Sequence, residues 1–298
     1  SNMSIFPRTE VGGRSLSRMI AGTNWMLGYS HCTRSKDAQI QETHSDYKSI
    51  ADILEVFFRN GVDTVMGPMC NAPHLCDAIR EAEDRTGVGA IRISTPGFKI
   101  TTETPEQGLD MDNVREVLDR EAEIGSDFCM PHTSTTDRLL DRCARKIRFM
   151  DQICAGIRER GMIPGLSTHS PESIVFADES GLDVETYISI YNTLGYLMHL
   201  EVDWTTKVIH QAERPVMTIK PLAAGQLRPL QGLAFVWSTL RDIDMVTIGT
   251  MTPREAEEVI EMSLSLLEHR ESKVELQETR SKETVKMTPG FLPKKLKK

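Results

Sequence analysis

The chain has 298 residues, of which 39% are hydrophobic and 26% are charged, and its formal net charge is −8 at pH 7. This composition is typical of a globular protein and excludes a chain that is disordered throughout, and no apolar run is long enough to form a transmembrane helix. An acidic chain also repels phosphate backbones, so nucleic acid is not an expected partner.

Short apolar segments alternate with amphipathic helical patterns along the whole chain. Eight of these segments are rich in Ile, Val and Met, and most are too apolar to be half-exposed antiparallel strands. The predicted strands are residues 18–25, 62–66, 90–94, 126–131, 162–166, 187–191, 216–219 and 245–248.

Helical patterns lie between the predicted strands. They cover residues 47–60, 74–85 and 112–124 and one long stretch at 137–160, and each is followed by a glycine suited to a C-cap. Two later helices begin with a capping residue followed by proline, at Ser170-Pro171-Glu172 and at Thr252-Pro253-Arg254-Glu255. Eight strands that alternate with helices predict a parallel (β/α)8 TIM barrel.

We expect the barrel to comprise residues 4–269, with a short N-terminal β-hairpin, and residues 270–298 to form a C-terminal tail. The tail holds nine Lys and Arg residues but four Glu, so it is a basic extension, either flexible in part or packed on the barrel. In such barrels the functional side chains stand where the strands end, at the C-terminal mouth. The residues expected at these ends include Asn24, Trp25, Asp63, Thr95, His132, Ser167, His169, Tyr191, Lys220, Gly249 and Thr250, and most of them are polar or aromatic.

Several segments, in the right order along the chain, resemble the aldo-keto reductases. Residues 9–23 resemble the family's hairpin and first strand, 61–64 its second strand, 125–132 its fourth and 165–170 its fifth. The most specific likenesses are K-P-L-A-A-G-Q-L at 220–227 and I-G-T-M-T-P-R-E-A-E-E at 248–258, which resemble the loops after the last two strands. The resemblance implies an oxidoreductase barrel that binds NADP(H) at its mouth.

The chemistry of that family needs an Asp, a Tyr, a Lys and a His around the substrate carbonyl. The resemblance places the aspartate at Asp63 and the histidine at His132, but the tyrosine position is Pro68 and the lysine position is Pro96. Loss of a positioned general acid costs roughly 10²–10⁴ in rate. We therefore do not expect ordinary carbonyl reduction, and we expect Asp63, His132 and Lys220 to carry the remaining chemistry.

The resemblance also implies a set of cofactor-binding residues. The loop at 221–225 would cradle a pyrophosphate, and the helix that starts after Thr250 would offer its positive N-terminus. The nicotinamide would lie between Ser167 and Tyr191, and Arg254 would pair with a 2′-phosphate. Thr168 and Val259 replace two family asparagines, so the sequence favours a phosphate site over a complete dinucleotide site. The full set is Ser167, Tyr191, Pro221, Leu222, Gly225, Gly249, Thr250 and Arg254.

Two other functions stay open. The first is a lyase, isomerase or hydrolase that uses Lys220, for example as a Schiff base, or a metal held by His132 and His169. The second is a non-catalytic protein that binds a nucleotide or another metabolite. Each of these hypotheses predicts a small-molecule or phosphate-bearing ligand and no membrane as a partner. A homo-oligomer remains possible under each. Irregularly spaced cysteines and no secretory signal predict reduced thiols in the cytoplasm.

Overall fold

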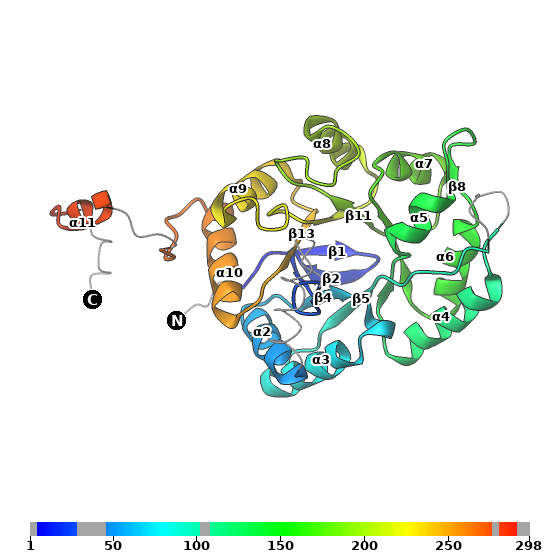
Figure 1. The fold of residues 1–298 in the computed structure, drawn as a ribbon, viewed down its shortest axis with the longest axis horizontal. Helices are drawn as coiled ribbons and strands as arrows, with labels where there is room; N and C mark the ends of the chain where they lie inside the picture. Colours follow the sequence, from blue (N-terminus) through cyan, green and yellow to red (C-terminus); the bar gives the residue numbers. More distant parts are fainter. Residues whose placement is uncertain (1–4, 29–45, 102–107, 276–279, 291–298) are drawn as a thin grey trace.

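The computed structural model describes residues 5–28, 46–101, 108–275 and 280–290, and these form a closed barrel of parallel strands surrounded by helices (Figure 1). The (β/α)8 prediction with its N-terminal hairpin is confirmed. In sheet order the strand segments are β10 (Leu166–Thr168), β11 (Tyr187–Ile190), β12 (Val216–Ile219), β13 (Met245–Gly249), β3 (Met19–Gly22), β4 (Thr64–Gly67), β5 (Ile91–Ser94), β6 (Phe128–Cys129) and β9 (Ile163–Pro164).

Two of these nine segments form a single barrel strand that is interrupted at Gly165. β9 pairs with β6 and β10 pairs with β11, so this strand joins the two ends of the sheet and closes the barrel. A Cβ atom on Gly165 would lie 2.5 Å from the Cε atom of Met130, so only glycine fits at the interruption. All eight predicted strands are therefore present.

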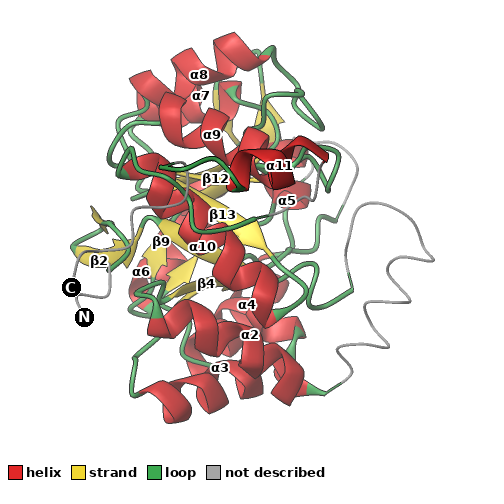
Figure 2. Cartoon of the chain, turned by 90° about the vertical axis from the view of Figure 1, so that its left-hand side faces the viewer, coloured by secondary structure: helices red, strands yellow, loops and turns green. Residues whose placement is uncertain are grey.

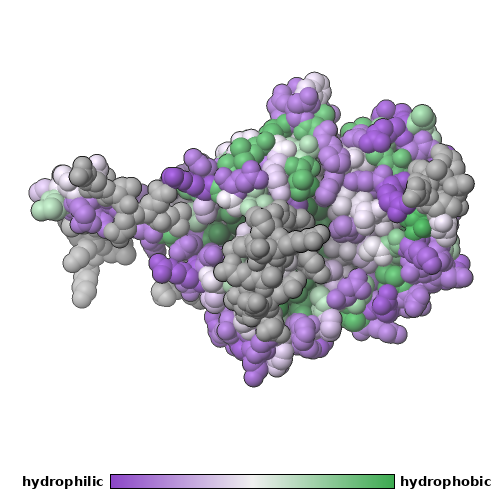
Figure 3. Space-filling model, in the orientation of Figure 1, coloured by the Kyte–Doolittle hydropathy of each residue, from purple (hydrophilic) through white to green (hydrophobic). Residues whose placement is uncertain are grey.

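The helices that surround the barrel (Figure 2) bury their apolar faces against it, and hydrophilic side chains are abundant on the outer surface (Figure 3). None of the described helices has the length and apolar character needed to cross a membrane. The helices are α2 (Tyr47–Arg59), α3 (Pro73–Thr86), α4 (Met111–Glu123), α5 (Thr133–Leu139), α6 (Met150–Glu159), α7 (Glu172–Ser180), α8 (Val202–Gln211), α9 (Pro229–Thr239), α10 (Pro253–Leu267) and, in the C-terminal tail, α11 (Arg280–Lys286). α11 stands apart from the barrel (Figure 1).

The single long helix predicted at 137–160 is wrong. The chain instead forms α5, a short hairpin of β7 (Leu140–Asp141) and β8 (Lys146–Ile147), and then α6. Asp141 holds the hairpin, because its carboxylate accepts hydrogen bonds from the Ala144 N–H at 2.9 Å and from Arg148 at 2.7 Å. The turn contains no Gly or Pro from which it could have been predicted. Its left-handed residue is Arg145, with a φ of 54°.

The N-terminal hairpin closes the bottom of the barrel. Its strands β1 (Arg8–Val11) and β2 (Arg14–Ser17) lie across the central opening in Figure 1. Val11 and Leu16 are buried and pack with the inward side chains of the barrel strands. Arg14 forms an ion pair of 3.2 Å with Asp127, which directly precedes β6. The hairpin therefore contacts the N-terminal ends of the strands, and the opposite, C-terminal end is left for a ligand.

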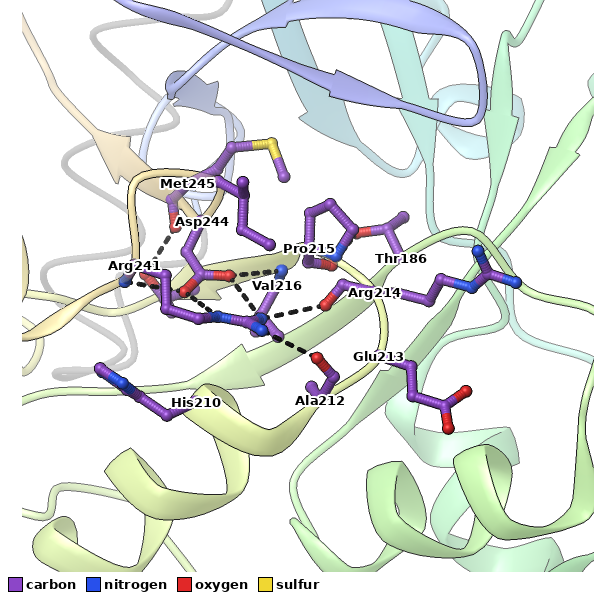
Figure 4. Close-up of polar contacts among 12 residues, drawn as sticks. Thr186, His210, Ala212, Glu213, Arg214, Pro215, Val216, Arg241, Asp244 and Met245 are labelled. Atoms are coloured by element: carbon purple, nitrogen blue, oxygen red, sulfur yellow. Dashed lines mark hydrogen bonds and ion pairs between the residues drawn. The ribbon is translucent and has the colours of Figure 1, made fainter.

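A buried polar network fixes β12 against β13 at this lower end (Figure 4). The fully buried Asp244 carboxylate accepts hydrogen bonds from the Arg241 guanidinium at 3.0 Å and from the Val216 N–H at 3.0 Å. Arg241 also donates to the carbonyl of Ala212 at 2.8 Å. A buried ion pair needs this many partners because both charges have lost water. The network holds the two strands whose upper ends carry Lys220 and Gly249.

Candidate functional site

A cavity of about 550 Å³ opens at the C-terminal ends of the barrel strands, within the range of small-molecule sites. Met66, Ile188 and Ile219 supply apolar surface, and polar side chains from other strands and from the loops that follow them complete the wall. These polar groups include Thr95, His132, Ser167, His169, Lys220 and Glu255. The site therefore combines an apolar interior with a few convergent polar groups.

Lys220 directly follows β12 and lies half-buried in the cavity wall. Its backbone has a φ of 58°, a strained conformation for a residue that is not glycine. No described residue forms a hydrogen bond or an ion pair with its ammonium group. Burial without a partner disfavours the charged form and lowers the pKa of Lys220 to about 8. At pH 7 about one tenth of this side chain is therefore the free amine.

His132 caps the N-terminus of α5 and lines the same cavity. Its Nδ1 atom accepts a hydrogen bond from the Ser134 N–H at 3.1 Å, so the proton of the neutral ring is on Nε2. Burial lowers the pKa of His132, and the nearby positive charge of Lys220 adds to this effect. The ring is thus neutral near pH 7 and has an Nε2–H donor for a ligand.

His169 is the second imidazole of the wall. Burial, with a further contribution from the charge of Lys220, lowers its pKa to about 4, so this ring is also neutral near pH 7. The backbone N–H of His169 donates to Asp137 at 3.1 Å, and the same carboxylate accepts from the Thr168 hydroxyl at 2.7 Å. Asp137 therefore ties the end of β10 to α5 and is not a counter-ion for Lys220.

The geometry gives no support to a metal at His132 and His169. Within the described ranges there is no group of three His, Cys, Asp or Glu side chains placed to hold a metal ion. The carboxylate of Glu255, on the other side of the cavity, accepts a hydrogen bond from the Met251 N–H at 2.9 Å.

Asp63 is not brought to this cavity, which corrects the sequence-based placement. It lies just before β4, at the end of the barrel that the hairpin covers, and forms a two-point ion pair with Arg8 at 3.0 and 3.1 Å. The physical reason is the position of Asp63 along the chain, before the first residue of β4, whereas the cavity lies at the other end of the strand. The residues of β4 that line the cavity are Met66 and Gly67, at the other end of the strand.

Tyr191 is likewise turned away from the cavity. It is fully buried between the barrel and the helices, where its hydroxyl hydrogen-bonds to Thr206 at 2.6 Å and Thr239 at 2.8 Å. Its ring packs on Phe235, with 5.2 Å between ring centroids. Side chains alternate along a strand, so Tyr191 shares the outer side with Tyr187, and Ile188 faces the interior instead. Tyr191 is therefore not placed to stack on a nicotinamide in this cavity, contrary to the prediction.

The structure divides the other expected cofactor residues into two groups. Ser167, Pro221, Leu222, Gly225 and Gly249 all line the cavity, whereas Thr250 and Arg254 do not. Thr250 is buried, and its hydroxyl has no partner among the described residues. The Arg254 side chain is 85% exposed and pairs with Glu258 on its own helix at 3.2 Å.

These residues do not fit NADP(H) at its phosphates. The N-terminus of α10 is already capped, because Thr252 accepts from the Glu255 N–H at 3.1 Å and the Glu255 carboxylate accepts from the Met251 N–H. In the loop after β12, four N–H groups donate to carbonyls of the same loop, at Ala223, Gly225, Gln226 and Leu227. Four of the donors in the loop expected to cradle a pyrophosphate are thus already paired, and we assign no chemical step to this cofactor.

Three residues of the cavity wall received no role from the sequence, namely Trp25, Thr247 and Glu255. The sequence placed Trp25 at a strand end, but the position of a residue in a loop does not show where its side chain lies. Thr247 has the inward parity of β13, and its buried hydroxyl has no partner within the described part of the chain. Glu255 was assigned as a helix-capping residue, and the structure shows that this same carboxylate borders the cavity.

No protein-family model matches the chain, and no curated protein matches its sequence. Its fold is similar to a structure described as "the putative aldo-keto reductase" from Pseudomonas aeruginosa, with a TM-score of 0.61, 16% identity, and coverage of 90% of this chain and 99% of that one.

Two further structures match less well. Aldose reductase from Giardia lamblia has a TM-score of 0.52 and 12% identity, over 91% of this chain and 90% of that one. A truncated 3-deoxy-D-arabino-heptulosonate 7-phosphate synthase from Thermotoga maritima has a TM-score of 0.53 and 10% identity, over 89% and 93%. At such identities the likeness concerns the fold alone, and the chain has a (β/α)8 barrel similar to those of these structures.

Proposed function

We propose that this barrel is an enzyme that acts on small aldehydes or ketones by forming an imine with Lys220. The observation that carries the proposal is the amine itself. It lies half-buried at a strand end in the wall of a cavity of about 550 Å³, and no carboxylate of the described residues forms an ion pair with it. Lysines whose pKa is lowered by burial serve as nucleophiles toward carbonyl groups.

The surroundings of Lys220 supply the other requirements of this step. A lysine with a pKa near 8 holds about 300 times more free amine at pH 7 than one with the ordinary value of 10.5. The Nε2–H of His132 can donate a hydrogen bond to the carbonyl oxygen and so polarise it for attack. The apolar residues Met66, Ile188 and Ile219 would surround the carbon chain of a compact substrate.

The bonds and atoms of the step balance without another reactant. The Nζ lone pair of Lys220 attacks the carbonyl carbon, a C–N bond forms, and the carbonyl π electrons move to oxygen. A neutral imidazole takes one proton from the positively charged Nζ and passes it to this oxygen, which gives the carbinolamine. The nitrogen lone pair then expels the hydroxyl group, which takes up a proton from solvent and leaves as water, so that a protonated imine remains. His132 and His169 are both neutral near pH 7, so either ring can transfer protons during these changes.

Borohydride trapping tests the proposal directly. The protein is incubated with short aldehydes and ketones and reduced with borohydride, and the modified lysines are located by peptide mass spectrometry. We expect reduction to leave the substrate on Lys220 at pH 7, and Lys220→Met to abolish this adduct. The matched control is Lys207→Met, because Lys207 lies on the outer helix α8 over the ring of Trp204 at 4.1 Å.

An adduct spread over surface lysines, with no preference for Lys220, would contradict the proposal. NADP(H)-dependent turnover of the same carbonyl compounds would favour the reductase reading that the resemblance implies. That reading retains one specific observation in its favour, since five of the eight expected cofactor residues line one cavity. Tight binding of a metabolite without any turnover would favour a non-catalytic protein.

A further inference from the structure

The indole ring of Trp25 occupies the part of the cavity between the last two strand–helix turns. Trp25 belongs to the loop after β3 and is half-buried. A Cβ atom on Gly249, at the end of β13, would lie 3.1 Å from its Cδ1 atom. A Cβ atom on Gly225, in the loop after β12, would lie 3.8 Å from its Cη2 atom. The ring therefore reaches from one turn to the other.

This contact explains why residue 249 is a glycine. The φ of Gly249 is not in the left-handed region, so its backbone would accept any L-residue. The limiting factor is space, because a side chain there would be pressed against the indole. Gly249 thus fits Trp25, whereas the sequence resemblance had connected this glycine with a phosphate group.

Several donors of these same two turns are already paired within the protein. The turn after β13 leads into α10, whose N-terminus is capped by Thr252 and by the carboxylate of Glu255. That carboxylate borders the cavity and would repel a phosphate. The loop after β12 satisfies four of its N–H groups internally. The position of Trp25, the helix cap and the loop hydrogen bonds are three separate observations, and all disfavour a dinucleotide.

We propose that Trp25 determines the substrate specificity of this barrel. Its ring fills the region where a dinucleotide would bind and so confines the site to compact substrates. The substrate class is then a short carbonyl compound without a nucleotide or phosphate tail. The carbonyl part rests on the proposed function, whereas the size limit set by Trp25 does not. Trp25 acts by occupying space in the same cavity that Lys220 lines, between Gly225 and Gly249.

Two amine reagents of different size test this role without any imine chemistry. Acetic anhydride is compact, and the succinimidyl ester of naphthoic acid is bulky, and both form an amide with a lysine. Labelling at Lys220 is measured by peptide mass spectrometry in the wild-type protein and in Trp25→Phe and Trp25→Ala. Trp204→Ala is the control, because Trp204 is 53% exposed on α8 and does not line the cavity.

We expect Trp25→Ala to raise the ratio of bulky to compact label at Lys220 by about tenfold or more, with Trp25→Phe between the two. Trp204→Ala should leave the ratio unchanged, and wild-type protein should not bind NADPH at millimolar concentration. An unchanged ratio in Trp25 variants that retain the wild-type circular dichroism spectrum, or 1:1 binding of NADPH to wild type, would overturn the proposal. Failure of imine trapping alone would remove the proposed function and leave the size limit standing.

Discussion

Replacing Lys220 by methionine should stabilise the protein while removing its proposed activity. Methionine has a similar length but no charge, and both residues experience the same strain at a φ of 58°. A lysine pKa that falls from 10.5 to about 8 corresponds to at most about 3 kcal/mol of destabilisation, at about 1.4 kcal/mol for each pKa unit. Because Lys220 is only partly buried, solvent screening reduces this value to about 1–2 kcal/mol.

The pH dependence gives this prediction a distinct signature. The folded-state pKa of Lys220 lies below the unfolded value, so the unfolded chain binds the proton more tightly. The destabilisation is therefore complete below about pH 8 and disappears as the pH rises toward 10.5. The advantage of Lys220→Met over wild type should be largest at pH 6–7 and should lose most of its size by pH 10.

Urea unfolding followed by circular dichroism at pH 6, 7, 8, 9 and 10 measures this difference. Lys207→Met is the matched control, since its partner is the exposed ring of Trp204, and its effect should not vary with pH over this range. A Lys220→Met protein that is less stable than wild type at pH 7, or whose advantage is the same at pH 7 and pH 10, would refute the reasoning.

Two further substitutions separate structural carboxylates from the site. Asp63→Asn should lower the free energy of unfolding in urea by about 1 kcal/mol, because Arg8 loses a partly exposed ion-pair partner. Imine trapping on Lys220 should stay as in wild type. A variant that folds normally but no longer traps the imine would show that Asp63 takes part in the chemistry. Asp244→Ala should cost about 3 kcal/mol, because it leaves the partly buried Arg241 guanidinium without its carboxylate and the Val216 N–H without its acceptor. A thermal unfolding curve like that of wild type would show that this network is dispensable.

The architecture could be predicted because it depends on a pattern that repeats along the chain. Apolar strand segments recur eight times and alternate with amphipathic helical patterns, four of which are followed by a glycine, and each repeat supports the same barrel. The Thr252 cap shows the same point locally, since the predicted capping residue accepts from the Glu255 N–H. The helix predicted at 137–160 failed because its break is made by the Asp141 side chain and a left-handed Arg145, for which the sequence has no common signal.

The candidate site could be predicted only where a residue's place on its strand was clear. His132, Ser167 and Lys220 follow or end strands and were found in the cavity wall. Asp63 was assigned to the wrong end of its strand, and Tyr191 to the wrong side of one, although the alternation of side chains along 187–191 already indicates the outer side. The place of Trp25 depends on loop packing against Gly249, which no local pattern encodes.

The most direct test of the account is the pKa of the Lys220 amine itself. Competitive acetylation between pH 6 and 11, with quantification of each labelled peptide, gives this value for Lys220 and for the surface residue Lys207 in the same sample. We predict half-maximal reactivity of Lys220 near pH 8. A Lys220 that titrates near 10.5, the ordinary lysine value, would contradict the claim that the cavity holds an unpaired and reactive amine.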